Sequence, residues 1–263
     1  MTLAYIDSVG LVSEGMIGFN ATRNVLMGGK YIKSPLEKYK PQVLPPNERR
    51  RATGLVRLSF QACEDALDNS SFSPSSLATV FSSSGGDYFV LDSLCNSIAR
   101  EERLLSPTLF HNSVHNAAAG YWMIGANSHH NSISLAAFDY SFGVGLLEAI
   151  TLLSLDKQPV LLAIYDAKPP PLIAEKRPIS TPFASALILS SKKTPNSQMT
   201  LKVKIVEDGT TTEPAHHDLI ALFKDNPAAR ILPLLEHIAS GTEGEIITQL
   251  PQDKFLKIEM ALC

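Results

Sequence analysis

The sequence predicts a layered α/β domain with a small antiparallel β/α addition at its C-terminal end. Through the first 167 residues, short apolar runs alternate with segments of helical periodicity, as in sheets that are covered by helices. After the prolines at 169–171 the pattern changes to short strand-like segments separated by polar turns, which favours antiparallel pairing. A chain of 263 residues suits one large domain, here divided into a core half at 1–167 and an extension at 168–263.

The elements of the core half follow from the two periodicities of strands and helices. Strands are expected where the apolar run is continuous, and helices where apolar residues recur three or four positions apart. The small residues 117–120 predict a tightly packed buried helix. Strands are predicted at 3–9, 77–82, 132–138 and 158–165, and further helices at 49–67, 87–102 and 142–155. The strand at 132–138 is expected to be buried, and the alternation predicts a mainly parallel sheet.

The extension has the features of a small antiparallel unit. Segments 184–190 and 200–206 are predicted to pair with each other, since the polar turn 192–197 joins them. A helix is expected at 228–240. Two final strands are expected at 245–250 and 254–260.

Composition excludes several classes of protein. The net charge of −3 argues against a nucleic-acid-binding protein, which would usually show a basic face. Three scattered cysteines (Cys63, Cys95 and Cys263) fit a reducing cytoplasm better than a disulfide framework. The N-terminus has no signal-peptide pattern, and the apolar runs are too short to cross a membrane. We therefore expect a cytoplasmic protein without a nucleic-acid or membrane partner.

Several motifs resemble the condensing enzymes of the thiolase fold, the β-ketoacyl synthases. They are VGLVSEG at 9–15, VFSSSGG at 80–86, LSPTLFHNSVHNAAAG at 105–120, SISLAAFDYSFGVGLLEA at 132–149 and VLLAIYD at 160–166. A narrower resemblance links LPPNERRR at 44–51, GLLEA at 145–149 and NPAARILPLLEHIA at 226–239 to short synthase-like proteins. Those proteins belong to aryl-polyene and similar type II polyketide systems and are described as chain length factors. The resemblance covers about residues 2–262 and implies a thiolase-like layered fold of the N-terminal type.

The nucleophile of the family is missing from its expected position. A working synthase uses a cysteine thiolate at the N-terminus of a buried helix, and two histidines that assist decarboxylation. Aligning the strand SISLAA, with Gly145 on the family's helix glycine, puts Ala137 where the cysteine belongs. A shift of one residue gives Ala136 or Phe138 instead, and no residue of 132–147 is a cysteine. The histidine motifs HGT and NxFGFGG are absent as well.

The resemblance therefore implies a non-catalytic chain length factor. Such a subunit pairs with a full-length β-ketoacyl synthase, shapes its acyl tunnel and meets the acyl carrier protein transiently. Neither a cofactor nor a metal is expected. The residues implied at the acyl pocket or the interface are Phe110, His111, Asn112, His115, Asn116, Ala137, Phe138 and Phe142.

Some of these residues allow a second interpretation. On one interpretation Phe138, Tyr140 and Phe142 fill the core. On the other they plug the vestigial pocket or form the floor of a shared tunnel, and the two interpretations are compatible. The arginines Arg49, Arg50 and Arg51 are either a solvated helix face or a docking site for an acidic carrier protein.

Two other functions remain open from the residues alone. A stand-alone acyltransferase or hydrolase would use Ser141, or His111 and His115, although no base partner for Ser141 is identifiable. A metal site would use the same two histidines, whose spacing of four places them on one side of a helix. No carboxylate stands at a suitable ligand spacing beside them.

Overall fold

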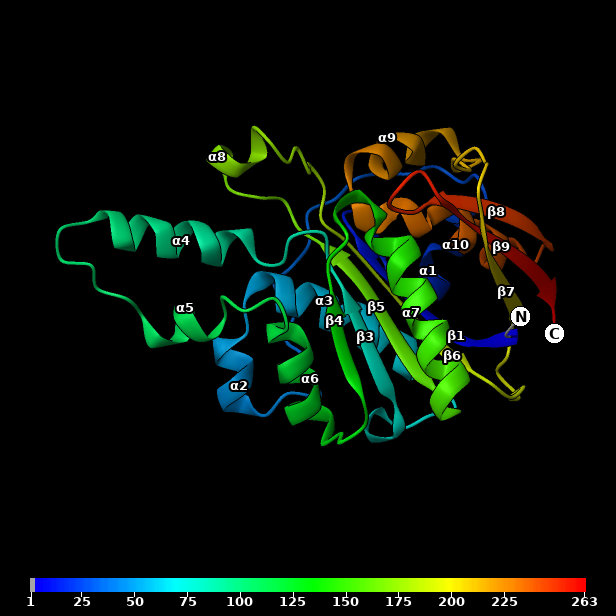
Figure 1. Ribbon diagram of the computed structural model, residues 1–263, viewed down its shortest axis with the longest axis horizontal. Coiled ribbons are helices and arrows are strands. Elements are labelled where there is room, and N and C mark those ends of the chain that lie inside the picture. The colour runs from blue at the N-terminus through cyan, green and yellow to red at the C-terminus, as the bar shows by residue number, and fades with distance from the viewer. Residues whose placement is uncertain (1–2) are drawn as a thin grey trace.

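A nine-stranded mixed sheet runs through the computed structural model, which describes residues 3–263 (Figure 1). The strands are β1 (Leu3–Ser13), β2 (Met16–Ile17), β3 (Ala78–Ser82), β4 (Ser132–Leu135), β5 (Val160–Asp166), β6 (Phe183–Ser190), β7 (Met199–Val206), β8 (Gly244–Gln249) and β9 (Phe255–Leu262). Their order is β4-β3-β5-β6-β1-β7-β9-β8, with β2 paired to β1. The predicted layered α/β class is confirmed.

Helices cover both faces of this sheet, and residues 3–263 also form three short 3₁₀ segments. The α-helices are α1 (Phe19–Leu26), α2 (Pro46–Arg51), α3 (Gly54–Asp68), α4 (Tyr88–Ala99), α5 (Pro107–His111), α6 (Ala117–Ala126), α7 (Ser141–Asp156), α8 (Pro171–Ala174), α9 (His217–Asp225) and α10 (Leu232–Ser240). The 3₁₀ segments are η1 (Pro74–Ser76), η2 (Phe138–Tyr140) and η3 (Pro227–Ile231).

The predicted parallel pairing is found within the core half, where β3 is parallel to both β4 and β5. The other six pairings are antiparallel, so the sheet as a whole is not mainly parallel. Helical crossovers join β3 to β4 and β4 to β5, and such crossovers are what parallel pairing requires. The expected direct pairing of β6 with β7 is also wrong, because β1 lies between them and Tyr5 faces both Ser190 and Thr200.

The sheet separates two apolar layers. Alternate residues of β5 point to opposite faces, so Leu162 belongs to one buried cluster and Leu161 to the other. Helices α1, α7, α9 and α10 close the first layer, and α3 and α6 close the second. Aromatic rings fill the second layer, where Phe60 meets Trp122 edge-on at 5.2 Å between ring centroids.

Three further element boundaries differ from prediction. The helix expected at 49–67 is interrupted before Gly54, because Thr53 caps α3 by accepting a hydrogen bond from the Val56 N–H. The helix expected at 228–240 begins as η3 and continues as α10. The strand expected at 132–138 stops at Leu135 and is half-buried, because β4 is the edge of the sheet.

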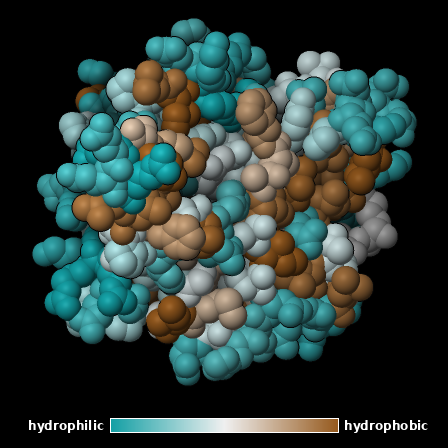
Figure 2. Space-filling view, turned by 60° about the vertical axis from the view of Figure 1, so that its left-hand side comes forward, coloured by the Kyte–Doolittle hydropathy of each residue, from teal (hydrophilic) through white to brown (hydrophobic). Residues whose placement is uncertain are grey.

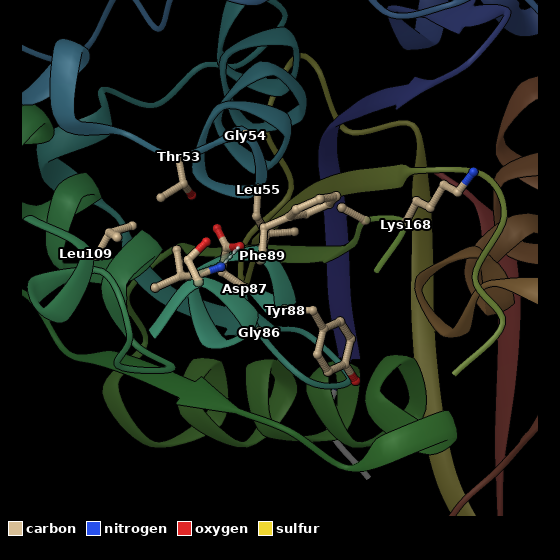
Figure 3. A pocket seen from close by; sticks show the side chains of 12 residues that line it. Thr53, Gly54, Leu55, Gly86, Asp87, Tyr88, Phe89, Leu109 and Lys168 are labelled. Carbon is tan, nitrogen blue, oxygen red and sulfur yellow. Dashed lines mark hydrogen bonds between the residues drawn. The ribbon is translucent and has the colours of Figure 1, made fainter. Parts of the chain in front are cut away.

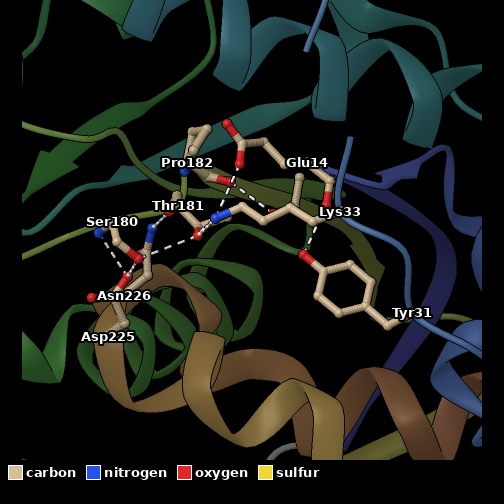
Figure 4. A network of polar contacts seen from close by, with 9 residues as sticks. Glu14, Tyr31, Lys33, Ser180, Thr181, Pro182, Asp225 and Asn226 are labelled. Atoms are coloured by element: carbon tan, nitrogen blue, oxygen red, sulfur yellow. Dashed lines mark hydrogen bonds and ion pairs between the residues drawn. The ribbon is translucent and has the colours of Figure 1, made fainter. Parts of the chain in front are cut away.

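Polar contacts fasten the long segment between α1 and α2 to the domain (Figure 4). The Lys33 ammonium lies 3.1 Å from the Glu14 carboxylate and donates to the Thr181 hydroxyl at 2.6 Å. The Tyr31 hydroxyl donates to the Glu14 carbonyl at 2.8 Å. This segment therefore has a fixed position beside β1.

The carboxylate of Glu64 holds the end of the same segment. It is buried on α3 and accepts hydrogen bonds from the Tyr39 hydroxyl and from the backbone N–H groups of Gln42 and Val43. Burial and this carboxylate raise the pKa of Tyr39. One acid therefore satisfies three donors that the loop cannot satisfy by itself.

Replacing Glu64 with alanine is expected to destabilise the chain by about 2–4 kcal/mol, since three donors lose their acceptor. Urea unfolding measures this loss, and proteolysis should cut the 37–44 segment first. The exposed Glu37, changed to alanine, is the control and should alter stability by less than about 0.5 kcal/mol. Equal stability of the two variants would contradict the role given to Glu64.

The stretch Phe138–Asp156, which includes α7, is long and apolar enough to cross a membrane by length and composition alone. Half of its apolar window is buried in the domain, and Phe142, Leu146 and Leu153 are fully covered. These side chains form part of the first apolar layer, as in core helices of globular domains.

Candidate functional site

A sharp turn connects β4 to α7 and contains Ala137, where the sequence resemblance predicts the nucleophile position. Phe138 adopts a φ of +54°, a left-handed conformation that bulky side chains rarely adopt and that often marks functional sites. Ser141 fastens the turn, because its hydroxyl donates to the Phe138 carbonyl at 2.7 Å and accepts from the Ala137 N–H at 3.1 Å. The residue at the tip is thus Phe138, one position after Ala137, and neither side chain can attack a thioester.

A cation covers this tip. The Arg177 guanidinium lies 3.8 Å from the centroid of the Phe138 ring and donates to the Asp139 carboxylate at 2.8 Å. Phe138 remains 55% exposed, so it is not part of the core. Phe142 is fully buried in the first apolar layer, where it fills the core. The two predicted aromatics therefore occupy different environments.

A buried acid lies beneath the neighbouring turn at the end of β3. Asp166 ends β5, and its Oδ1 accepts hydrogen bonds from the Ser83 hydroxyl at 3.0 Å and from the Ser84 N–H and hydroxyl at 2.9 and 2.8 Å. The His115 Nε2 atom lies 3.2 Å from the Ser83 carbonyl. Burial raises the pKa of Asp166 to about 6, although these hydrogen bonds and Arg177 oppose the shift.

Asp166 makes stability depend on pH. Its folded pKa lies above the value of about 3.9 for an unfolded aspartate, so stability falls as the pH rises from about 4 through about 6. Asp166→Asn keeps an acceptor for Ser83 and Ser84 without the buried charge. We expect this variant to be about 1–3 kcal/mol more stable than the parent at pH 8 and nearly equal at pH 4.

Urea unfolding between pH 4 and pH 8 tests this expectation. The exposed Asp68, changed to asparagine, is the control and should retain the slope of the parent. A parent and an Asp166→Asn variant with the same pH dependence would rule out a raised pKa at Asp166.

Helices α4 and α5 form an arm that extends away from the sheet (Figure 1). An apolar pocket of about 300 Å³ lies where the arm leaves the domain, between α3, α4 and the residues after β5 (Figure 3). Leu55, Phe89, Val90 and Leu109 contribute apolar side chains, and Lys168 also lines the pocket. Such a lining suits an alkyl chain.

A second hollow, of about 500 Å³, lies between α5 and α6. Phe110, Val114 and Ile124 line it and are 65%, 53% and 57% exposed, which is unusual for neighbouring large apolar residues. Figure 2, turned to bring this side forward, shows apolar patches among the hydrophilic surface. We call the α5–α6 residues around this hollow the apolar face.

The structure brings together only some of the predicted pocket residues. Phe110, His111 and Asn116 line the hollow of the apolar face. Asn112 is buried and donates to the carbonyls of Arg51 and Thr108. His115 turns to the end of β3, and Ala137, Phe138 and Phe142 belong to the turn and the core.

The geometry does not favour a site made by the two histidines or by Ser141. Helix α5 ends at His111, so His115 does not share a helical face with it. The His111 ring packs edge-on against Tyr121, whereas His115 faces Ser83. Within residues 3–263, no three histidine, cysteine or acidic side chains gather as metal ligands. The Ser141 hydroxyl is buried and bonded to backbone.

The three arginines of α2 have different surroundings. Arg49 is half-buried and donates to the carbonyl of Leu44 at 2.8 Å, so it anchors the preceding loop. Arg50 and Arg51 are exposed and contact Asn47 and Glu48 within the same helix. Arg50 thus remains open to an acidic partner, whereas Glu48 already pairs with Arg51.

Sequence reasoning missed Asp166 and Arg177. The position of Asp166 at the end of an otherwise apolar strand could have identified it, because an acid that is buried with such a strand needs hydrogen-bond partners. Arg177 lies in a loop 38 residues after Asp139, and no local pattern predicts that contact.

Comparison with known proteins connects this arrangement to one family. The model of the β-ketoacyl synthase N-terminal domain matches residues 28–244. No curated protein sequence matches the chain.

Solved structures show the same architecture. A ketosynthase in complex with its chain length factor from Xenorhabdus doucetiae has 22% identity and a TM-score of 0.72, covering 98% of this chain and 99% of the matched chain. A type II polyketide ketosynthase bound to its acyl carrier protein has 11% identity and a TM-score of 0.77, covering 100% and 99%. A β-ketoacyl synthase from Burkholderia phymatum STM815 has 14% identity and a TM-score of 0.62, covering 88% and 71%. The predicted thiolase-like fold is confirmed.

Proposed function

Because the chain belongs to the β-ketoacyl synthase N-terminal domain family, we propose that it is a chain length factor without condensing activity. In this role it is a cytoplasmic subunit that pairs with a full-length β-ketoacyl-(acyl carrier protein) synthase and shapes its acyl tunnel. The acyl carrier protein meets the pair transiently, and the growing product is a polyene or polyketide chain.

The observation that carries the proposal is the turn between β4 and α7. It keeps the strand–turn–helix geometry that would present a nucleophile, including a residue with positive φ, but Ala137 and Phe138 supply no thiol. Arg177 and Asp139 further occupy the tip. A subunit with this turn but without a thiol could still fit against a catalytic synthase. It would not compete with that synthase for the acyl substrate.

Two surfaces support pairing. The apolar face exposes Phe110, Val114 and Ile124, which an interface core would bury. Strand β4 is paired on one side only, and α6 packs beside it. An open strand edge next to an apolar surface is normally protected by a further chain. The similarity to a ketosynthase–chain length factor complex, over 99% of the matched chain, agrees with this reading.

The pocket under the arm is the space that we assign to the acyl chain. Its apolar walls at Leu55, Val90 and Leu109 suit a hydrocarbon, and Phe89 of α4 narrows the same pocket. The length of chain that fits then depends on the side chains of α4.

Native mass spectrometry of the chain, alone and co-expressed with a full-length synthase encoded nearby, tests the proposal. We expect a stable one-to-one complex, and condensation of carrier-bound substrates only when both subunits are present. The chain alone should neither transfer nor hydrolyse an acyl thioester, and Ser141→Ala should not change that result. Failure to pair with any encoded synthase, or acyl chemistry by the isolated chain, would overturn the proposal.

A further inference from the structure

A third hollow, with a polar lining, lies apart from the apolar face and the arm. Its volume is about 170 Å³, and it is bounded by η2, the loop before α9, η3 and the end of β8. Most of its lining side chains are polar or charged, among them Asp139, Thr211, Glu213, Arg230, Thr248 and Gln249. Convergent polar groups in a small hollow are typical of a site that binds a polar ligand.

Arg230 supplies the main charge of this hollow. Its guanidinium carbon lies over the Phe223 ring, 4.5 Å from the centroid, and this cation–π contact restrains the side chain. No side chain or carbonyl in the described part of the chain accepts a hydrogen bond from it, although an arginine has five N–H donors. Burial lowers the pKa of Arg230, and Asp139 and Glu213 only oppose that effect.

The two acids near Arg230 already have partners of their own. The Asp139 carboxylate accepts from Arg177 at 2.8 Å, and the Glu213 carboxylate lies 2.9 Å from the Lys224 ammonium. Arg177 and Lys224 therefore balance the two carboxylates, and the positive charge of Arg230 has no ion-pair partner among these groups.

Three neutral side chains add unused donors. The hydroxyls of Thr211 and Thr248 and the amide of Gln249 line the hollow, and none makes a side-chain hydrogen bond within residues 3–263. Thr248 is 6% exposed, and its hydroxyl retains some access to solvent. A ligand that accepts hydrogen bonds and carries a negative charge would satisfy all of these groups together.

We infer that this hollow binds a small oxyanion, a phosphate or carboxylate group, with Arg230 as the principal ligand and Thr211, Thr248 and Gln249 as further donors. A guanidinium fork matches such a group through two parallel hydrogen bonds. The inference stands on the hollow itself and does not depend on pairing with a synthase.

Isothermal titration calorimetry of the full chain with inorganic phosphate, and separately with acetate, tests the inference. We expect saturable one-to-one binding of at least one of them, weakened about tenfold or more in Arg230→Gln. Arg100→Gln removes an exposed arginine elsewhere and should bind like the parent. Phosphate binding alone identifies a phosphoryl ligand, and comparable acetate binding identifies a carboxylate. Absence of binding to both anions, or equal binding by Arg230→Gln, would overturn the inference.

A second variant keeps the test decisive if Arg230→Gln does not fold. Glu213→Gln removes a negative charge from the rim of the hollow, where the side chain is 46% exposed and not needed for the core. It should tighten phosphate binding several-fold, because the anion then meets less repulsion. Unchanged affinity in Glu213→Gln would contradict a site at this hollow.

Discussion

Changing Phe110 and Val114 together to aspartate is expected to abolish stable pairing with the synthase while leaving the chain folded. Both side chains are more than half exposed, so the isolated chain loses no core packing. In the complex, two carboxylates would be buried against apolar surface without partners, which carries a large desolvation penalty. We expect the dissociation constant to rise about 100-fold or more.

Analytical ultracentrifugation or native mass spectrometry of the co-expressed subunits measures this change. A matched control places aspartate at Leu155 and Met27, which are 75% and 55% exposed and lie outside the apolar face. The control pair should assemble like the parent. If both double variants assemble equally well, the apolar face is not the interface, and the proposed pairing must use another surface.

Replacing Gly10 with alanine is expected to cause one of the largest losses of stability among the glycine-to-alanine changes in this chain. A β-carbon at Gly10 would lie 1.9 Å from the carbonyl oxygen of Ala62 and 2.8 Å from the backbone nitrogen of Ala66. Both atoms belong to the backbone of α3, so no side-chain rotation relieves the clash. The helix must move off the sheet, which we expect to cost about 3 kcal/mol or more.

That loss is a large share of a typical total stability of about 5–15 kcal/mol. Urea unfolding compares Gly10→Ala with Gly54→Ala, whose added carbon meets no atom within 4 Å. The Gly54 variant should be unchanged or up to about 1 kcal/mol more stable, because alanine reduces the freedom of the unfolded chain. Equal stability of the two variants would show that α3 does not approach β1 this closely.

The positions of most elements could be predicted from the sequence, whereas the partners of the strands could not. Strand β5 is buried on both faces and reads as an unbroken apolar run, so its position was clear. The insertion of β1 between β6 and β7 depends on pairings such as Ser13 with Phe183 and Leu3 with Lys202, which are far apart in the sequence. Local sequence patterns indicate the hydrophobic periodicity of a segment and the positions of turns. They do not indicate which distant strand pairs with a given strand.

The same division applies to the site. The absence of a thiol from the turn after β4 follows directly from the motif around Ala137. The left-handed residue of that turn, Phe138, and its cover by Arg177 depend on the three-dimensional path of a later loop. The hollow around Arg230 could not be predicted either, because Thr211, Arg230 and Thr248 come from three separated segments of the chain.

The central place of β6 has a consequence for how the chain is made. The hydrogen bond from the Ser185 hydroxyl to the Gly10 carbonyl spans 175 positions, and the sheet cannot close around β1 until β6 has been synthesised. At about 5–20 residues per second, a nascent β1 waits about 9–35 s for that partner. During this interval its apolar edge is open to other chains, so the yield of folded protein should depend on translation speed and on chaperones that hold the emerging strand.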